Sequence, residues 1–563
     1  MRVLGIEGTA WMASAAVYDD TTSEEPTEFH DRYEPDSGGI HPREAAEHMS
    51  DAVPTVVGDA LTHARDRWGT EPIDAVAFSR GPGLGPCLRI VGTAARALAG
   101  RLDVPLVGVN HMVAHLEIGR HQSGFDAPVC LNASGANAHL LGFHGDRYRV
   151  LGETLDTGVG NALDKFTRHL DWSHPGGPKV ERHAADGDYH ELPYVVKGMD
   201  FSFSGIVSAA QQAVDDGVPV ADVCAGLQET IFGMLTEVSE RALSLTGADG
   251  LVLGGGVGQN DRLRGMLREM SAQRDAEFFA PAPRYLRDNA SMIAVLGARM
   301  AAAGDTVAVS DSAVDPDFRP NEVPVTWRDG ESVRRVTQPD ETVRGAEATV
   351  TVAEPVVKRR EPKTYRHPAL DDWLRRERTT HEARLLAAAR KQGVPTPLVR
   401  EVDVDAGELR LSRVGDCDLA AVVTDQSTGS GDEPDPEAVV TRVGGHLARL
   451  HAAGIVHGDL TTRNVRVTTD RPDGGTEQPQ TDRPRTFLID FGLGFHTDHV
   501  EDLAVDLHVF EQSLAGTADD PETLIAAVEE RYVAVADHVE TSVADGEAVV
   551  ERLREVERRG RYQ

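Results

Sequence analysis

Residues 250–260 read Gly250-Leu-Val-Leu-Gly-Gly-Gly-Val-Gly-Gln-Asn260, an apolar run that leads into a glycine-rich turn and then into a helical pattern. Short β-branched runs that end at glycine or a polar turn also occur elsewhere along the chain. These runs cover residues 2–6, 75–79, 106–109 and 128–131, and helical patterns such as residues 94–101 lie between them. Strands that alternate with helices predict an α/β fold.

The chain has 563 residues, which is too long for one hydrophobic core and predicts two or three domains. Its 91 acidic residues outnumber 57 basic ones, and the net charge of −34 excludes a generally basic nucleic-acid coat protein. Few of the basic residues are lysine. An acidic, lysine-poor chain predicts life in concentrated salt, where the Debye length falls to about 3 Å at 1 M. GC-rich codon usage also exchanges lysine for arginine, but it does not explain the acidic excess.

The α/β pattern covers residues 1–325, and the polar, proline-containing residues 326–342 are expected to form a linker. A second domain is expected at 343–563, with a strand at 348–358 and a helix at 370–390. The four cysteines are far apart and form no CxxC, so neither a disulfide framework nor a zinc ribbon is expected. Neither a signal peptide nor an apolar run of about 18 residues is present, so we expect a soluble cytoplasmic protein without a membrane partner.

His111-Met-Val-Ala-His115 places two imidazoles four residues apart. On a helix they share one face and can bind one metal ion. The alternative is that both are core or capping residues. A zinc peptidase would need a glutamate directly after the first histidine as its general base, and Met112 stands there.

Three glycine-rich turns at strand ends favour nucleotide binding, because glycine lets backbone N–H groups approach a phosphate. They are Gly5-Ile-Glu-Gly-Thr9, Ser134-Gly-Ala-Asn137 and the turn within residues 254–260.

Several motifs together resemble one known family. They are Gly5-Ile-Glu-Gly-Thr9, His41-Pro-Arg-Glu-Ala-Ala-Glu-His48, Gly81-Pro-Gly-Leu-Gly-Pro-Cys-Leu-Arg89, His111-Met-Val-Ala-His115, Gly160-Asn-Ala-Leu-Asp-Lys165, His174-Pro-Gly-Gly-Pro-Lys179, Phe201-Ser-Phe-Ser-Gly205 and residues 254–260. Over residues 1–320 the chain resembles the universal tRNA threonylcarbamoyltransferase family in its archaeal form. The resemblance implies an actin-like ATPase fold, with two duplicated ribonuclease-H-like lobes and a nucleotide cleft between them.

This family transfers a threonylcarbamoyl group from threonylcarbamoyl-adenylate to N6 of adenosine 37 in tRNAs that read ANN codons. The resemblance implies one divalent metal ion, iron or zinc, which acts as a Lewis acid and is held by His111, His115 and Asp288. The residues that it implies for binding the adenylate are Asn132, Ala133, Ser134, Gly135, Ala136, Asp164, Gly177, Glu181 and Asn260.

One position departs from the family pattern. Archaeal relatives usually have tyrosine, a possible metal ligand, where this chain has Asn132. A neutral amide oxygen is a weaker ligand for a transition metal than a phenolate. We therefore predict a metal site with three protein ligands, with Asn132 as a possible further ligand and with substrate or water in the remaining positions.

The second domain contains His457-Gly-Asp-Leu-Thr-Thr-Arg-Asn464, which has the spacing of a kinase catalytic loop, and Ile489-Asp-Phe-Gly492 follows it. In that arrangement Asp459 orients the accepting hydroxyl or water, while Asn464 and Asp490 hold magnesium on the phosphates of ATP. Lys358 is expected to reach the phosphates from a strand, with Glu382 on the next helix as its ion-pair partner.

Two kinase features are reduced. The phosphate loop shrinks to Arg344, Gly345, Ala346, Glu347 and Ala348, and Asp506 follows Asp490 too closely for an activation loop. ATP hydrolysis with little platform for a protein substrate is expected. Residues 340–563 resemble the small atypical serine/threonine kinase of the archaeal KEOPS complex, a reduced protein-kinase-like α+β domain. The whole chain is similar to the fusion of transferase and kinase found in some archaea, which implies other KEOPS subunits as partners.

The end of the chain, with Arg558, Arg559 and Arg561, has no acidic residue after Glu557 and is expected to contact tRNA phosphates. The alternative is a solvated helix end. For the whole chain, the alternative function is a serine/threonine protein kinase with a nucleotide-binding scaffold domain. A secreted peptidase is disfavoured by Met112 and by the lack of a signal peptide.

Overall fold

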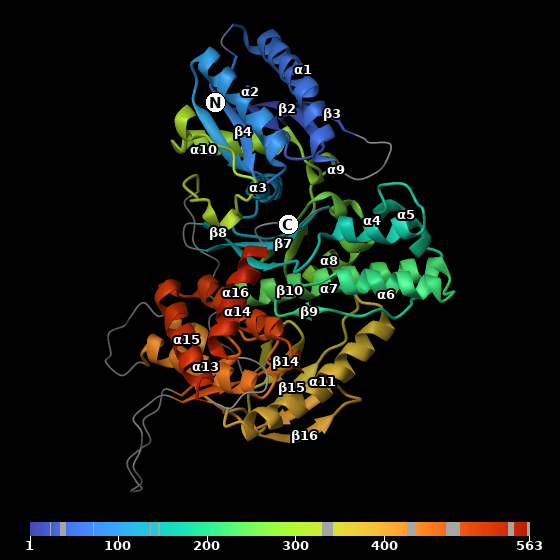
Figure 1. The fold of residues 1–563 in the computed structure, drawn as a ribbon, viewed down its shortest axis with the longest axis vertical. Helices are drawn as coiled ribbons and strands as arrows, with labels where there is room; N and C mark the ends of the chain where they lie inside the picture. Colours follow the sequence, from blue (N-terminus) through green and yellow to red (C-terminus); the bar gives the residue numbers. More distant parts are fainter. Residues whose placement is uncertain are drawn as a thin grey trace.

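The computed structural model describes residues 1–22, 24–33, 41–70, 72–135, 137–144, 147–328, 342–424, 434–468, 485–538 and 545–559. Two α/β lobes follow one another along the long axis, and a third region built from the rest of the chain lies beyond the second lobe (Figure 1). We call these parts the first lobe, the second lobe and the C-terminal region.

The first lobe is a five-stranded sheet in the order β3-β2-β1-β4-β5. Its strands are β1 (Arg2–Glu7), β2 (Met12–Asp19), β3 (Thr27–Arg32), β4 (Ala75–Gly81) and β5 (Leu106–Asn110). The helices are α1 (Pro42–Trp68), α2 (Gly85–Leu102) and α10 (Ala290–Ala302). Helix α10 lies so close to β1 that a Cβ atom on Gly5 would come within 2.6 Å of the Ala294 nitrogen.

The second lobe repeats this arrangement with the sheet order β12-β11-β6-β7-β8. Its strands are β6 (Val129–Ala133), β7 (Ala138–His144), β8 (Arg147–Glu153), β11 (Gly250–Gly254) and β12 (Glu277–Phe279), with a small hairpin of β9 (Val196–Lys197) and β10 (Asp200–Phe201). The helices are α4 (Val159–His169), α5 (Gly177–Ala184), α6 (Ser204–Asp215), α7 (Val220–Thr246), α8 (Asp261–Gln273) and α9 (Pro283–Leu286).

The two sheets share one topology. In each, the first strand in the sequence pairs antiparallel with the second and parallel with the fourth. This duplication fits the actin-like ATPase fold that we expected. Helix α3 (His111–Ser123) connects β5 to β6, and its apolar residues join a buried cluster that contains side chains from both lobes. The chain thus places His111 and His115 between the lobes.

The C-terminal region begins with an antiparallel sheet in the order β13-β14-β15-β17-β16, against which helix α11 (Pro368–Lys391) packs. The strands are β13 (Thr342–Arg344), β14 (Ala348–Thr351), β15 (Val356–Arg360), β16 (Val399–Asp403) and β17 (Glu408–Leu411). Short strands and helices complete it: β18 (Cys417–Asp418), β19 (Ile455–Val456), β20 (Val465–Val467), β21 (Thr486–Leu488), β22 (Phe495–His496), α12 (Leu419–Val423), α13 (Pro436–Ala452), α14 (Val500–Thr517), α15 (Pro521–Ala536) and α16 (Gly546–Arg559).

The expectation of one strand over residues 348–358 was wrong. Those residues form the hairpin of β14 and β15, because Ala353-Glu-Pro355 interrupts the run and proline cannot donate a ladder hydrogen bond. The helix expected at residues 370–390 is confirmed as α11.

Helix α7 lies on the side of the second lobe that faces the C-terminal region (Figure 1). It is buried on nearly all sides from Val223 to Leu243, and Tyr365 of the C-terminal region belongs to the same hydrophobic cluster. The two regions therefore share a core as well as a covalent connection.

Candidate metal and nucleotide sites

The two histidines lie in the first turns of α3. The Asn110 side chain caps this helix by accepting hydrogen bonds from the Met112 and Val113 N–H groups at 3.0 and 3.1 Å. The cap fixes where the helix begins, and the spacing of four residues then brings the two imidazole centroids to 4.8 Å from each other. Both histidines are buried.

Asp288 approaches these imidazoles from the segment between α9 and α10. Its Oδ1 lies 3.3 Å from His111 Nε2 and 3.5 Å from His115 Nε2. The ligand atoms of His111, His115 and Asp288 lie within 4.8 Å of one another. Within the described ranges, no other group of three or more His, Cys, Asp or Glu side chains converges in this way. The structure thus brings together the three residues that the sequence predicted as metal ligands.

Glu7, at the end of β1, holds His111 from the other side. Its Oε2 lies 3.1 Å from His111 Nδ1, and its Oε1 accepts a hydrogen bond from the Thr9 N–H at 2.8 Å. Because Nδ1 is bound to this carboxylate, Nε2 is the imidazole nitrogen that faces Asp288 and is free to bind a metal ion. No role for Glu7 follows from the motifs alone, although a carboxylate at the end of an apolar strand is a usable signal.

Carboxylates dominate the electrostatics of this cluster. Burial alone would lower the pKa of His111, but Glu7 and Asp288 outweigh burial and raise this pKa to about 10. Burial lowers the pKa of His115. The two imidazoles hold the pKa of Asp288 far below its usual range although burial opposes this shift. A buried pair of imidazoles against an ionised carboxylate is a donor set suited to a divalent transition metal.

Asn132, at the end of β6, is buried beside the cluster. Its Nδ2 lies 3.6 Å from Met112 Sδ, and its Oδ1 has no hydrogen-bond partner. Gly255 has φ of 83°, and a Cβ atom there would come within 2.7 Å of Asn132 Oδ1. Only glycine therefore leaves room for this amide, which has an oxygen available to a ligand.

The residues expected to bind the adenylate meet around the start of α4, α5 and α8. Asp164 accepts a hydrogen bond from the Gly176 N–H at 2.6 Å and lies 3.0 Å from His174. Gly177 begins α5, and Glu181 on that helix accepts from the Asp261 N–H at 2.8 Å.

Asn260 caps α8 by accepting from the Arg262 and Leu263 N–H groups. Its amide also donates to Gln228 at 3.2 Å. The turn that contains Ser134 and Gly135, next to Ala133, is bonded to the start of α4, while Ala136 lies outside the described residues. The expected adenylate residues therefore shape neighbouring loops, and several of their polar atoms already have protein partners.

In the C-terminal region, Lys358 on β15 lies 2.9 Å from both carboxylate oxygens of Glu382 on α11 and 2.7 Å from Asp490. Burial would raise the pKa of Asp490, but Lys358 and Arg360 outweigh burial and lower it. Asn464 donates to the Asp459 carbonyl at 2.8 Å and lies 3.4 Å from its Oδ2. These five predicted kinase residues thus form a group of three, Lys358 with Glu382 and Asp490, and a pair, Asn464 with Asp459.

An arginine of the second lobe enters this site. Arg241 on α7 lies 3.4 Å from Asp459 Oδ2 and 2.8 Å from Glu237 of its own helix, and it also contacts Glu347. Glu237 in turn accepts hydrogen bonds from Arg366, Arg378 and Tyr194. The sequence gives no sign of this network, because no local pattern pairs a helix of one domain with a loop of another.

Residues 344–348, which the sequence predicts as a reduced phosphate loop, also contact the second lobe. Arg274 donates to the Gly345 carbonyl at 2.6 Å, and Lys363 donates to the Ala346 carbonyl. Glu347 pairs with Arg378 at 2.6 Å, Ala348 is buried, and Arg344 is exposed. The loop is therefore held against α7 and α8.

The side chains of Arg558 and Arg559, and all of Arg561, lie outside the described residues. No helix in the described part of the chain is long and apolar enough for a membrane crossing.

Comparison with known proteins identifies the class of this fold and site. The family described as "TsaD: tRNA N6-adenosine threonylcarbamoyltransferase" matches residues 21–295. A protein of Haloarcula marismortui is 63% identical over all of both chains, and one of Halobacterium salinarum is 64% identical over all of this chain and 99% of its own. Both are named "Probable bifunctional tRNA threonylcarbamoyladenosine biosynthesis protein". The chain belongs to this family, and the halophilic origin of both relatives agrees with the concentrated salt that its acidic, lysine-poor composition predicts.

Among solved structures, HypF from T. kodakarensis covers 52% of this chain with 47% of its own length, at 13% identity and a TM-score of 0.40. This likeness is too slight to bear on the fold.

Proposed function

We propose that this chain is a bifunctional enzyme of tRNA threonylcarbamoyladenosine biosynthesis. Its first two lobes transfer a threonylcarbamoyl group from threonylcarbamoyl-adenylate to N6 of adenosine 37 in tRNAs that read ANN codons. The convergence of His111, His115 and Asp288 between the lobes is the observation that carries this proposal. Membership of the family supports the same reaction.

His111, His115 and Asp288 are the residues that would hold the metal ion, iron or zinc, and Asn132 offers a further oxygen. When bound, the ion supplies a Lewis acid for the acyl carbonyl. Glu7 keeps the Nε2 atom of His111 turned toward Asp288, and the buried positions of both imidazoles keep bulk water away from the reacting carbonyl. The loops around Asp164, Glu181 and Asn260 position the adenylate.

The role of Glu7 gives a prediction. Glu7→Gln keeps the side-chain shape but removes the charge behind His111, so metal affinity should fall about 10- to 100-fold. The measurement is a competition titration of the purified chain against a chelator. Glu47→Gln, on the exposed face of α1, is the matched control. Equal affinity in Glu7→Gln and the parent chain would show that Glu7 does not orient the ligand.

We further propose three parts for the chain, which are the transferase at 1–325, a linker at 326–342 and a reduced protein-kinase-like α+β domain at 343–563. Residues 329–341 of this linker lie outside the described residues, and its last residue, Thr342, is the first residue of β13. The paired Lys358 and Glu382 next to Asp490 support ATP binding with magnesium held by Asn464 and Asp490. The phosphate loop would be residues 344–348. Helix α14 begins at Val500, soon after Asp490, which leaves little room for a peptide platform. ATP hydrolysis that regulates the transferase is therefore the favoured role.

ATP turnover should depend on pH through Asp459. Burial raises the pKa of Asp459 to about 7, against the opposing effect of Arg241 and with the help of Asp490. Because Asp459 must be ionised to orient the attacking water, the rate should fall as pH drops below about 7. Steady-state ATP hydrolysis between pH 5.5 and 8.5, roughly one unit and a half on each side of that pKa, is the measurement. Asp490→Asn should abolish turnover at every pH, and an unchanged rate in that variant would refute the assignment.

We propose that tRNA is the macromolecular substrate. The proposed location is the cytoplasm, and the proposed partners are other KEOPS subunits.

Deleting residues 558–563 should weaken tRNA binding. If Arg558, Arg559 and Arg561 contact phosphates, the slope of log K against log salt should fall by up to about 3. Filter-retention binding at several salt concentrations measures this slope. An unchanged slope would show that the three arginines do not contact tRNA phosphates.

The second candidate function is a serine/threonine protein kinase with a nucleotide-binding scaffold domain. The formed Lys358–Glu382 pair is the observation in its favour. Loss of tRNA modification in a metal-ligand variant separates the two functions, because a scaffold needs no metal ligand.

A further inference from the structure

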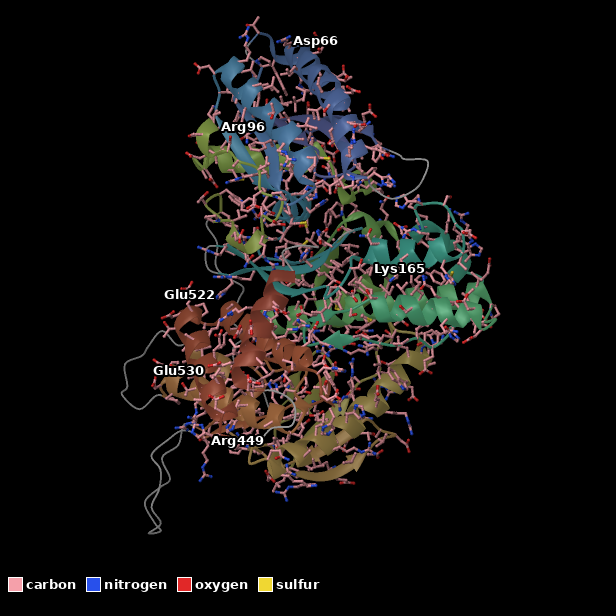
Figure 2. All side chains as sticks on the ribbon, in the orientation of Figure 1. Asp66, Arg96, Lys165, Arg449, Glu522 and Glu530 are labelled. Carbon is pink, nitrogen blue, oxygen red and sulfur yellow. The ribbon has the colours of Figure 1, made fainter. Side chains whose placement is uncertain are left out.

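A group of basic side chains lies on α4 and α5 of this otherwise acidic chain. Residues 165–183 contain four lysine or arginine residues against two carboxylates, whereas the whole chain has 57 against 91. The four are Lys165, Arg168, Lys179 and Arg182, and they include two of only six lysines in the chain. Figure 2 places Lys165 on α4, and Figure 1 shows α5 next to α4 in the second lobe. We call these four residues the basic surface.

The cations of the basic surface are available to a ligand. Three of the four are exposed, and Lys179 is half-buried. Among the residues that the structure describes, none of the four pairs with a carboxylate. The acidic side chains of the same two helices have other partners, because Asp164 pairs with His174 and Glu181 accepts from the Asp261 N–H. The basic surface therefore keeps its positive charge for a ligand.

Contacts between the two helices hold these cations in a fixed arrangement. Within each helix the two cations are three residues apart, so they project from the same side. The Trp172 ring, in the loop between the helices, stacks on His183 of α5 with centroids 4.5 Å apart and 23° between the planes, and it also packs against the core of the second lobe. Lys179 donates a hydrogen bond to the Ser173 carbonyl of the same loop. The basic surface is thus preformed by packed elements.

The basic surface adjoins the loops that we propose to position the adenylate. The N–H of Gly160, near the start of α4, donates to the Ser134 carbonyl at 3.1 Å. Arg168 follows Gly160 by eight residues, which is about 12 Å along a helix. Helix α5 likewise carries Gly177 and Glu181 among its own cations. A ligand on the basic surface therefore lies beside the adenylate loops.

The exposure and spacing of the four cations favour an extended polyanion. A single phosphate is bound by donors that converge on it, often backbone N–H groups at a helix start, whereas these side chains are spread along two helices. The net charge of −34 makes the chain as a whole repel RNA, so phosphate contacts should concentrate where cations have no carboxylate partner. The backbone of RNA supplies a series of separated negative charges that lysine and arginine bind.

We propose that the basic surface binds phosphates of tRNA on the nucleotides beside adenosine 37, and that it thereby brings N6 of this adenosine to the adenylate loops. The inference rests on the proposed transferase function, because it takes tRNA as the acceptor. It is separate from the contact proposed for residues 558–563. Because phosphate contacts carry no sequence information, the basic surface positions the tRNA and does not select the base.

The test replaces one exposed arginine on each helix, Arg168→Gln together with Arg182→Gln, in the full-length chain. Filter-retention binding of tRNA is measured at several potassium chloride concentrations at which the thermal transition shows that each chain is folded. Each phosphate contact contributes about 0.7 to 0.9 to the slope of log K against log salt, so the slope should fall by about 1.5 and the affinity at the lowest salt by about tenfold. Arg101→Gln together with Arg384→Gln removes the same charge from exposed positions on α2 and α11 and should bind like the parent chain.

Transfer kinetics separate a tRNA surface from a site for a small anion. In the Arg168→Gln, Arg182→Gln variant the KM for tRNA should rise about tenfold, while the KM for threonylcarbamoyl-adenylate and kcat should stay near the parent values. The proposal is overturned if tRNA affinity and slope are unchanged, if the control variant loses as much affinity, or if only the KM for the adenylate rises.

Filter retention needs no group transfer, so the two proposals can fail separately. Formation of threonylcarbamoyladenosine together with unchanged tRNA binding by the variant would refute the basic surface and leave the proposed function standing. The expected loss of slope, with no modified nucleoside from the parent chain, would refute the proposed function and leave the basic surface standing as a tRNA contact.

Discussion

Replacing His115 with alanine is expected to abolish tRNA modification and to empty the metal site. The imidazole faces Asp288 from within a buried helix, and its loss leaves a two-ligand site that cannot retain a divalent ion. Because Lewis-acid stabilisation of the reacting carbonyl is worth several kcal/mol, the transfer rate should fall by about 10³-fold or more.

The measurement combines metal analysis of the purified variant with single-turnover transfer from the adenylate to tRNA. His30→Ala, on the exposed face of β3, is the control and should keep both metal and activity. The thermal unfolding transition, compared with that of the parent chain, provides an internal check that the variant is folded. Full modification by His115→Ala would favour the scaffold alternative, in which the histidines are core residues.

The second large effect is expected from Arg241→Met. This guanidinium is buried, and it pairs with Glu237, Glu347 and Asp459. Methionine fills a similar volume but leaves buried carboxylates with less compensating charge. Breaking a buried ion pair by removing one partner typically costs 3–5 kcal/mol, so the contact between α7 and the C-terminal region should loosen by about that amount. Arg384→Met, on the exposed side of α11, is the control.

The same variant should change the pH dependence of ATP turnover. Arg241 opposes the burial that raises the pKa of Asp459, so its loss should raise this pKa further above about 7. The rate–pH profile should therefore move to higher pH, because the role that we propose for Asp459 needs its ionised form. Hydrogen exchange of residues 344–348 and the ATPase profile are the two measurements. Unchanged protection together with an unchanged profile would show that Arg241 does not couple α7 to the C-terminal region.

The sequence predicted most of the fold because apolar periodicity is a local signal. The strands that begin at Arg2, Ala75, Leu106 and Gly250 start where the pattern placed them, since each run is short, apolar and ended by glycine or a polar turn. Residues 348–358 were misjudged, because a hairpin with a short connection has nearly the same composition as one long strand.

The candidate sites show the same difference between local signals, which the sequence carries, and long-range contacts, which it does not. The pairing of His111 with His115 follows from helical spacing, whereas the approach of Asp288 is a long-range contact that only the family resemblance indicated. Glu7 and Arg241 act through contacts between distant segments, 104 residues apart for Glu7 and His111. Periodicity carries no information about such contacts, and the structure was needed to find them.

The most direct measurement of the central claim is mass spectrometry of nucleosides from tRNA after incubation with the metal-loaded chain, the proposed partner subunits and threonylcarbamoyl-adenylate. We predict that threonylcarbamoyladenosine appears with the parent chain, and that it is absent both with Asp288→Asn and with a tRNA that lacks adenosine at position 37. Equal amounts of the modified nucleoside from Asp288→Asn and the parent chain would contradict the account, because the cluster between the lobes would then have no part in the transfer.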